Sequence, residues 1–300
     1  MSGSPIKTWS TPVAEEEQAF VPCALCTGLS FNPFFNCDGF AYVKCVVCGL
    51  VQINPQPCPE HVYRRYQELY GSDYCSYEMD NEAAFLELQK HALKDARFFQ
   101  LEKKIMAGKE GPPAILDVGC ATGALLAFFQ ERGWQVAGVE ISPSAEYAQA
   151  RLGQKISRMD LQNSHFSDES FDLVHASHLI EHLNNPQAFL SEVWRILRPD
   201  AYFMLTTPNI DGVQARMFKS RWRSAIFDHL YLFSARTLKA MLRESGFSIE
   251  GIYTWGGLAA GIAPLPVKRL ADKMVKIFGI GDVMLVNAKK KDYNISSGDK

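Results

Sequence analysis

Strand-like and helix-like segments alternate along the chain from residue 114 onward, and this alternation restricts the fold more than any other feature. We expect buried strands at AILDVG, WQVAGVE, FDLVHAS and AYFMLTTP, with amphipathic helices between them. Such alternation is typical of a doubly wound α/β domain with a mostly parallel sheet. In a domain of this kind, ligands bind beyond the carboxyl ends of the strands.

The first expected strand runs into a tight turn of small residues, Gly119-Cys120-Ala121-Thr122-Gly123, and a helix follows. A dinucleotide fingerprint needs a third glycine at this point, and the sequence has none there. Asp117 lies at the strand end just before the turn. Its charge would repel a pyrophosphate and would suit a cationic ligand that carries an amino group and a sulfonium.

Two further acids follow the next strands. Glu140 ends the second strand, where a carboxylate can accept hydrogen bonds from both hydroxyls of a ribose. Asp160, in SRMDLQN, is expected to meet the amino group of an adenine, with Leu161 donating a backbone N–H. Carboxylates at successive strand ends therefore predict a site for a positively charged ligand that contains adenosine.

Taken in order, these segments resemble the class I S-adenosylmethionine-dependent methyltransferases over roughly residues 112–290. The resemblance is strongest to the branch with a Glu-His pair after the fourth strand and a later D-H-L-x-x-F-S segment. Ala121 stands where the family has its middle glycine, and Asp200-Ala201 stands where it has Gly-Gly. The segments that carry the resemblance are ILDVGCATG, VAGVEIS, MDLQN, FDLVHASHLIEHLNNP, RILRPDAYFMLTTPN and DHLYLFS.

The resemblance implies a Rossmann-like sheet of seven strands, with IEGIYTW and DVMLVNAKK as a last antiparallel pair. It also implies S-adenosylmethionine as the cofactor. An amphipathic segment, VKRLADKMVKIFG, lies between the last two strands and is interpreted as an inserted helix within 257–281 that serves as a substrate lid. The residues expected to bind the cofactor are Asp117, Gly119, Cys120, Gly123, Glu140, Ile141, Asp160, Leu161 and Ser177.

Four residues near the strand ends are candidates for catalysis. His178, Glu181 and His182 lie in HLIEHL, where the spacing puts them on one face of a helical turn, and His229 lies in FDHLYLFS. In small-RNA 2′-O-methyltransferases and ubiquinone-pathway O-methyltransferases, a similar face and a later histidine bind magnesium. A divalent cation at these four residues is therefore one alternative, although His178 replaces an acid and makes a hard cation less favourable. A histidine base and a purely structural role are the others.

Two CxxC pairs, Cys23-Ala-Leu-Cys26 and Cys45-Val-Val-Cys48, are separated by eighteen residues. This spacing predicts a four-thiolate zinc site, which we interpret as structural because four protein ligands leave no open position. Gly28 and Gly49 follow the pairs, where a positive φ is often needed. Disulfides are the alternative, and they are rare in a cytoplasmic protein.

The order of these features predicts four parts: a tail and zinc ribbon in 1–58, a helical connector or substrate cap in 59–111, the methyltransferase domain in 112–292, and a tail in 293–300. The connector is expected to contain one long amphipathic helix over 82–107, ended by Gly108. Its tyrosines recur at helical spacing and either form a wall over a substrate or pack on the next domain, which we favour. They are Tyr63, Tyr66, Tyr70, Tyr74 and Tyr77.

Another segment that could contact substrate is a basic and aromatic stretch around Trp222, flanked by Arg221 and Arg223. It either grips a phosphate or carboxylate of the acceptor or is a solvated loop, and the sequence favours neither alternative. His175, inside an expected strand, is predicted to be buried with its hydrogen bonds satisfied.

Charge and hydropathy narrow the function further. The formal net charge is −2, which disfavours a nucleic-acid partner. The N-terminus lacks a signal pattern, so we expect a cytoplasmic protein without a membrane span. The sequence therefore predicts methyl transfer to a small-molecule acceptor such as a sugar, a lipid intermediate or a natural product, with O-methylation favoured. An RNA methyltransferase that uses its zinc ribbon for RNA contact and a non-catalytic binding or scaffold protein are the alternatives.

Overall fold

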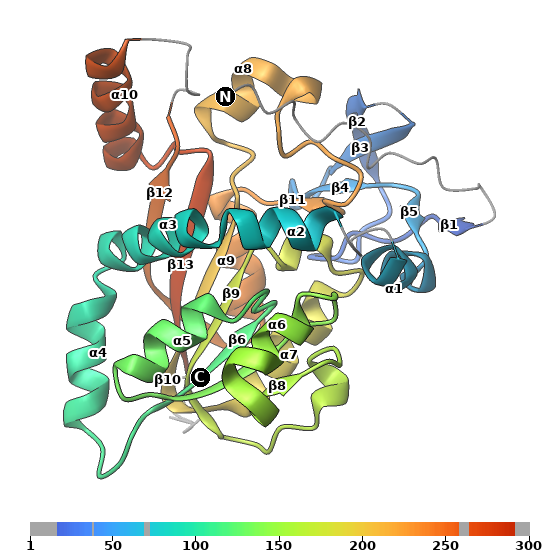
Figure 1. The fold of residues 1–300 in the computed structure, drawn as a ribbon. Coiled ribbons are helices and arrows are strands. Elements are labelled where there is room, and N and C mark those ends of the chain that lie inside the picture. The colour runs from blue at the N-terminus through green and yellow to red at the C-terminus, as the bar shows by residue number, and fades with distance from the viewer. Residues whose placement is uncertain (1–16, 38, 69–72, 258–263, 292–300) are drawn as a thin grey trace, which may run out of the picture.

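The computed structural model describes residues 17–37, 39–68, 73–257 and 264–291, and its centre is a seven-stranded sheet (Figure 1). The strand order is β12-β13-β10-β9-β6-β7-β8, and β13 runs antiparallel to both of its neighbours while the other pairs are parallel. The predicted mostly parallel, doubly wound sheet is thereby confirmed. The strands are β6 (Ala114–Val118), β7 (Gln135–Val139), β8 (Ile156–Ser157), β9 (Phe171–Ser177), β10 (Leu197–Pro208), β12 (Phe247–Trp255) and β13 (Val283–Lys290).

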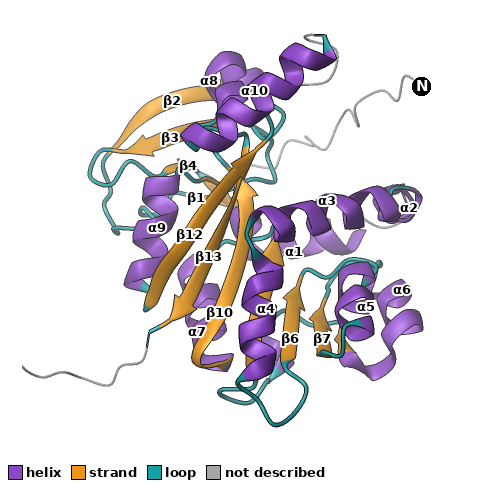
Figure 2. Ribbon diagram, turned by 90° about the vertical axis from the view of Figure 1, so that its left-hand side faces the viewer, coloured by secondary structure: helices purple, strands orange, loops and turns teal. Residues whose placement is uncertain are grey.

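Helices cover both faces of this sheet (Figure 2). On one face lie α5 (Ala124–Glu131) and α6 (Ala145–Leu152), and on the other lie α7 (Pro186–Ile196) and α9 (Ala235–Glu244). The start of α7 is set by Asn185, whose side chain accepts a hydrogen bond from the N–H of Ala188. A capping box between Ser234 and Thr237 sets the start of α9.

Four connector helices precede the sheet: α1 (Pro59–Glu68), α2 (Asp73–Asp80), α3 (Glu82–Asp95) and α4 (Phe98–Ala107). The single helix predicted over 82–107 is wrong, because Arg97 adopts a left-handed conformation with φ of 56° and breaks it. The break lets the chain turn, so that the fully buried Phe98 packs against Phe129 and Trp134 beneath the sheet. The predicted stop at Gly108 is confirmed.

The N-terminal module forms a second sheet that borrows a strand from the large domain. Strands β2 (Phe31–Cys37), β3 (Phe40–Cys45) and β4 (Val51–Ile53) are joined by β11 (Tyr231–Leu232) in the order β11-β4-β3-β2. A separate two-stranded sheet pairs β1 (Gln18–Ala19) with β5 (Gln56–Pro57). The module therefore shares both backbone pairing and hydrophobic core with the large domain.

Two more helices lie at one end of the molecule, α8 (Val213–Phe218) and α10 (Leu265–Phe278) (Figures 1 and 2). Helix α10 is the inserted amphipathic helix that the sequence predicts between the last two strands. Within the described residues, none of the helices combines the length and the apolar character needed to cross a membrane.

Candidate active site

A cavity of about 1340 Å³ opens at the carboxyl ends of β6, β7 and β9, beneath the connector helices. Tyr63 of α1, Tyr77 of α2 and Phe85 of α3 line its connector side. The interpretation that we favoured for the tyrosines, packing on the next domain, is wrong for Tyr63 and Tyr77, which are 49% and 41% exposed and face the cavity. The side chains of Tyr66, Tyr70 and Tyr74 lie outside the described residues.

The turn after β6 forms one wall of the cavity. The backbone N–H groups of Gly119 and Cys120 donate to the carbonyl of Val139, at 2.8 and 3.1 Å, which draws the turn toward β7. Gly123 has φ of 75°, and a Cβ there would approach Leu152 to 3.1 Å. Ala121 also adopts a positive φ, 47°, a conformation that glycine adopts without a steric cost.

Seven of the nine residues predicted to bind the cofactor line this cavity, and two do not. Gly123, the last residue of the turn, is buried, and Asp117 is 2% exposed. The Oδ1 atom of Asp117 lies 2.7 Å from Nδ1 of His175, whose ring does reach the cavity and is buried as predicted. The seven residues in the lining are Gly119, Cys120, Glu140, Ile141, Asp160, Leu161 and Ser177.

Glu140 is held in place by the turn that it faces. Its carboxylate accepts hydrogen bonds from the N–H groups of Ser142 at 2.8 Å and Ala121 at 3.0 Å. Burial raises the pKa of Glu140, and these N–H groups oppose that shift. Each oxygen accepts one of these bonds and keeps a further acceptor position, which suits a pair of ribose hydroxyls.

Glu78 of α2 is a cavity residue that sequence reasoning missed. It accepts a hydrogen bond from the hydroxyl of Ser144, at the start of α6. Burial raises the pKa of Glu78 to about 7, and the nearby Glu140 adds to this rise while Ser144 opposes it. The connector lies outside the segments that resemble the family, so no motif pointed to this residue.

The pKa of Glu78 predicts a pH-dependent stability. Its ordinary value is 4.5, so between 4.5 and about 7 the folded protein holds a proton that the unfolded chain has lost. Stability should therefore fall as pH rises through this window. Glu78→Gln mimics the protonated form, so its free energy of unfolding at pH 8 should be about 2–3 kcal/mol higher than that of wild type. Urea unfolding at pH 4.5 and pH 8 measures this. Asp80→Asn, on the exposed end of α2, is the control, and equal curves for wild type and Glu78→Gln at pH 8 would contradict the assignment.

A second set of contacts joins the connector to the turn after β6. Arg151 of α6 donates to the carboxylate of Glu82 on α3, with 2.8 Å between Nη2 and Oε1. The same guanidinium donates from Nη1 to the carbonyl of Thr122 in the turn, at 3.2 Å. The connector helices are thereby fixed over the cavity.

Three of the four predicted catalytic residues come together, and two of them, His182 and His229, line the cavity, whereas Glu181 is buried behind the lining. Glu181 and His182 lie in a 3₁₀ turn, Ile180–His182, and ligand atoms of these two residues and of His229 all lie within 4.8 Å of one another. The rings of His182 and His229 meet edge to face, with centroids 4.6 Å apart. His178, with φ of 53° and its side chain 48% exposed, joins through Nδ1, 3.3 Å from Oε1 of Glu181.

Burial controls the charge of this cluster. It lowers the pKa of both His182 and His229 to about 3, so both rings are neutral at neutral pH. Nδ1 of His229 lies 2.8 Å from the carbonyl of Ser224, to which a neutral ring must donate, so Nε2 is the nitrogen with a lone pair. Glu181 is fully buried, and although burial raises its pKa, the adjacent His178 outweighs this and lowers it.

The basic and aromatic stretch around Trp222 fits neither alternative completely, the grip on a phosphate or carboxylate or the solvated loop. Trp222 is 2% exposed, and its Nε1–H donates to Oδ1 of Asp282 at 2.5 Å. Arg223 lines the cavity but also donates from Nε to Oδ2 of the same carboxylate at 2.9 Å. A solvated loop is therefore excluded at Trp222, and the charge of Arg223 is partly neutralised.

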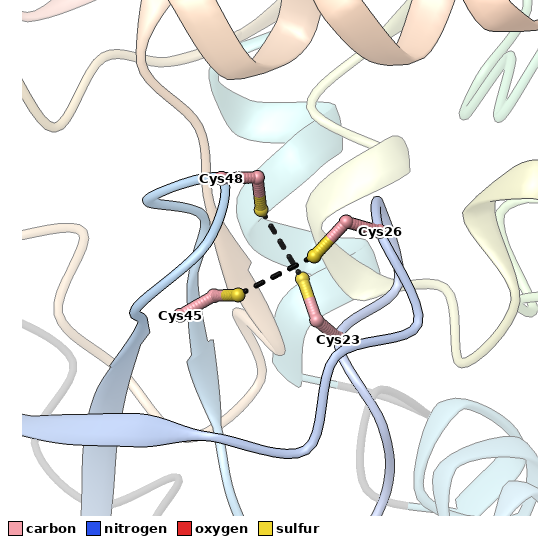
Figure 3. A group of neighbouring side chains, drawn as sticks. All are labelled: Cys23, Cys26, Cys45 and Cys48. Carbon is pink, nitrogen blue, oxygen red and sulfur yellow. Dashed lines mark hydrogen bonds between the residues drawn. The ribbon is translucent and has the colours of Figure 1, made fainter.

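The four CxxC cysteines converge outside the cavity (Figure 3). The Sγ atoms of Cys23 and Cys48 are 3.4 Å apart, as are those of Cys26 and Cys45. A disulfide needs about 2.05 Å, and all eight cysteines are free, so the disulfide alternative is wrong. These separations are close to the edge of a tetrahedron with Zn–S bonds of about 2.3 Å.

The four thiols differ in how readily they ionise. Burial raises the pKa of Cys23 and Cys48, whereas at Cys45 the N–H of Cys48 and the thiol of Cys26 outweigh burial and bring the pKa down to about 7. Gly49 has φ of 81°, as predicted. In the first pair, however, it is Thr27 that adopts the positive φ, 57°, so the expectation for Gly28 is wrong. Equivalent positions directly after each pair, Thr27 and Gly49, close the two turns.

The cysteine module supports the loop that carries His229. The hydroxyl of Tyr42 lies 2.9 Å from the carbonyl of Ile226 and 2.8 Å from that of His229. The N–H of Ile53 donates to the carbonyl of Leu230 at 2.9 Å. The position of the His229 ring in the cavity therefore depends on the fold of the N-terminal module.

Comparisons with known proteins agree with the fold. Residues 85–251 match the family model described as "Methyltransferase domain", which is more than half of the chain. A Mycolicibacterium smegmatis protein named "Probable S-adenosylmethionine-dependent methyltransferase" is 28% identical over 155 residues, 48% of this chain and 57% of that protein. A ubiquinone biosynthesis O-methyltransferase of Pseudomonas entomophila is 27% identical over 139 residues, 43% of this chain and 57% of its own length. The chain thus spans little more than half the length of these curated relatives.

A solved structure with the same fold covers most of the chain. It is the 1,6-didemethyltoxoflavin-N1-methyltransferase of Burkholderia thailandensis, solved with 1,6-didemethyltoxoflavin and S-adenosylhomocysteine bound. It covers 87% of this chain and all of its own, with a TM-score of 0.50 and 18% sequence identity. At that identity the similarity concerns the fold alone.

Proposed function

The chain belongs to the methyltransferase-domain family, and we propose that it transfers a methyl group from S-adenosylmethionine to the oxygen of a small-molecule acceptor. The observation that carries this proposal is the placement of Glu140, Glu78 and Asp160 around one cavity at the strand ends. Their carboxyl groups would favour a cofactor with positive charge on its sulfonium and amino groups. A pyrophosphate would be repelled by the same groups.

The size of the cavity supports an acceptor bound beside the cofactor. Pockets for a single small ligand have volumes of about 300–1,000 Å³, and this cavity, at about 1340 Å³, is larger. Its acidic end would hold the adenosine through Glu140, Asp160 and the N–H of Leu161. The part of the cavity lined by His182 and His229 would then hold the acceptor. The name of the Pseudomonas relative supports oxygen as the methylated atom.

The residues at the acceptor end supply a proton acceptor. When bound, S-adenosylmethionine provides a methyl group on a sulfonium, which is a good leaving group. His229 would take the proton of the acceptor hydroxyl at Nε2, because its Nδ1–H is held by the carbonyl of Ser224. Burial makes its ring a weak base, and the Glu181 carboxylate, which raises the pKa of His229 against this effect, would stabilise the imidazolium that forms. Orienting the two reactants can lower the barrier by about 7–11 kcal/mol, and a general base accelerates such reactions by a factor of about 10²–10⁴.

A divalent cation is the second candidate role for Glu181, His182 and His229. Their ligand atoms lie close enough together to hold one ion, and Oε1 of the buried Glu181 pairs only with Nδ1 of His178, at 3.3 Å, among the described side chains. One carboxylate and two neutral imidazoles fit a first-row transition ion better than magnesium. Such an ion would lower the pKa of an acceptor hydroxyl at the same place.

We also propose that the four-cysteine cluster holds a structural zinc. Four sulfurs fill all positions of a tetrahedral ion, and the cluster lies outside the cavity. Its role would be to keep the module folded beneath the His229 loop.

The cofactor assignment is tested by titration calorimetry with S-adenosylmethionine. Glu140→Ala should weaken binding by about 100-fold, because two hydrogen bonds to a charged carboxylate are lost at about 1.5 kcal/mol or more each. Glu146→Ala, on the exposed face of α6, is the matched control and should bind like wild type. A Glu140→Ala variant with a native circular-dichroism spectrum and wild-type affinity would refute the assignment.

A further inference from the structure

Helix α10 carries an apolar stripe on its outer surface. Its large apolar side chains recur at helical spacing and are 41–65% exposed: Val267, Leu270, Met274, Ile277 and Phe278. On a helix of 3.6 residues per turn these five positions fall on one face about 100° wide. Exposed apolar residues scattered singly are ordinary on a protein surface, but a continuous stripe of this kind marks an interaction site.

The helix is held to the protein along a different face. Val275 is its buried residue, at 4% exposure, and its carbonyl accepts a hydrogen bond from the hydroxyl of Thr254 at 3.1 Å. Asp272 accepts from the N–H of Gly257 at 3.0 Å. In the described part of the chain, no α10 residue lines the large cavity, so the prediction of a substrate lid finds no support in this conformation.

Cations flank the stripe. Helix α10 contains four basic residues and one acid, and two of the basic residues are paired, Lys268 with Asp272 at 2.8 Å and Lys276 with Asp95 of α3 at 2.5 Å. Arg269 and Lys273 are exposed and make no ion pair among the described residues. The stripe therefore lies beside positive charge that is not neutralised by the protein itself.

The neighbouring helix α8 extends this surface. Hydrogen bonds join α8 to residues on either side of α10 in the chain, from Gln214 to the carbonyl of Gly257 and from Val213 N–H to the carbonyl of Ile280, at 2.9 and 3.0 Å. Met217 of α8 is 58% exposed, and the exposed cations Lys219 and Arg221 follow it. Figures 1 and 2 show α8 and α10 together at one end of the molecule.

This end is the one at which the cavity is built. Strand β12 runs parallel to β10, because both pair antiparallel with β13, so its last residue, Trp255, lies at the carboxyl edge of the parallel strands. Trp255 lines the cavity, and α10 packs beside it through Thr254 and Gly257. An object bound to the stripe would therefore sit at the edge of the active site.

We propose that α10 rests on a membrane surface rich in anionic lipid, with its apolar stripe in the headgroup region. An exposed apolar stripe beside unpaired basic residues is the pattern of helices that lie in the plane of a bilayer. A second copy of the chain fits this surface less well, since a symmetric contact would bring the same cations together. This inference does not depend on the proposed methyl transfer.

Vesicle sedimentation tests the proposal with the full chain. Wild type should bind vesicles of equimolar phosphatidylcholine and phosphatidylglycerol, and bind pure phosphatidylcholine and high-salt samples more weakly. Ile277→Glu should lower binding by about tenfold or more. Replacing Arg269 and Lys273 by glutamine should lower it by about fivefold per cation removed. Tyr147→Glu, on exposed α6 across the sheet, adds the same charge and should bind as wild type does.

Each outcome of these measurements either supports or overturns the membrane-surface proposal. Loss of binding in Ile277→Glu, with a native circular-dichroism spectrum and unchanged affinity for S-adenosylhomocysteine, supports the proposal. Wild type that fails to bind the anionic vesicles at low salt, or variants that bind as well as wild type, would overturn it. A dimer in analytical ultracentrifugation that Ile277→Glu dissociates, without vesicle binding, would instead assign the stripe to a second copy of the chain.

Discussion

Replacing His229 by asparagine is expected to lower kcat by about 10²–10⁴-fold and to leave the Kd for S-adenosylmethionine unchanged. Asparagine can still donate a hydrogen bond to the carbonyl of Ser224, which His229 Nδ1 contacts at 2.8 Å, so the loop should keep its position. It has no basic nitrogen to accept a proton. The measurement is turnover of methyl-labelled S-adenosylmethionine with an acceptor found by screening small-molecule extracts.

The matched control for this prediction is His91→Asn, because His91 is exposed on α3 and does not line the cavity. It should turn over like wild type. Treatment with EDTA separates the two roles proposed for the cluster: loss of turnover, restored by a transition-metal ion, identifies His229 as a ligand, and resistance to EDTA identifies it as the base. Wild-type turnover in His229→Asn contradicts both roles.

Loss of the proposed structural zinc is expected to abolish turnover even though the cysteines lie outside the cavity. Zinc binding contributes about 10–16 kcal/mol in zinc-finger peptides, which is comparable with the entire stability of a domain, about 5–15 kcal/mol. Without the ion, the module would lose β4, which pairs with β11, and Tyr42, which contacts the carbonyl of His229. The His229 loop would then lose its support.

Cys48→Ala tests this prediction, with zinc content, hydrogen exchange of residues 40–57 and turnover as the three measurements. Purified wild type should contain about one zinc per chain, and the variant should contain none, exchange rapidly and be inactive. Cys58→Ala is the control, because Cys58 lies near the module but outside the four-cysteine cluster. Full turnover in a metal-free Cys48→Ala protein would show that the module does not support the site.

The central sheet could be predicted from the sequence because its signals are local. Each buried strand is a short apolar run bounded by glycine, proline or polar residues, and Ser234 starts a helix at the residue that its capping box requires. Alternation of such elements leaves few topologies for the sheet. The number of strands, seven, and the antiparallel last pair followed from the resemblance and are confirmed.

The position of Asp117 could not be predicted in the same way. Asp117 and His175 are direct neighbours on β6 and β9, and their side chains pair at 2.7 Å. That pairing depends on the register between the two strands, whose paired residues are 58 positions apart in the sequence. The register cannot be predicted from local sequence patterns. Asp117 is therefore buried and absent from the cavity lining, whereas His175, its partner, belongs to the lining.

The sequence also did not indicate which connector residues line the cavity, because their positions depend on tertiary packing. Glu78 and Tyr77 of α2 line the cavity through the packing of the connector, in which Arg151 of α6 pairs with Glu82 of α3. The break at Arg97 depends on the apolar pocket formed by Phe129 and Trp134, which draws Phe98 inward. Helical periodicity continues through this point in the sequence, so it predicts one helix where the packing requires two.

Sequence spacing identified the cysteine cluster but not what it supports. Two CxxC pairs specify the ligands, whereas the pairing of β4 with β11 joins segments about 180 residues apart (Val51 with Leu232). Through this sheet the N-terminal module is joined to the segment that follows His229. For this reason we expect loss of the zinc to affect the position of His229.

The placement of the cofactor can be checked by a crystal structure of the chain with S-adenosylhomocysteine. We expect the nucleoside in the cavity at the ends of β6 and β7, with its ribose hydroxyls within hydrogen-bonding distance of the Glu140 carboxylate. Density for the nucleoside at another place, or a cavity that takes NAD and leaves the nucleoside unbound, would contradict it.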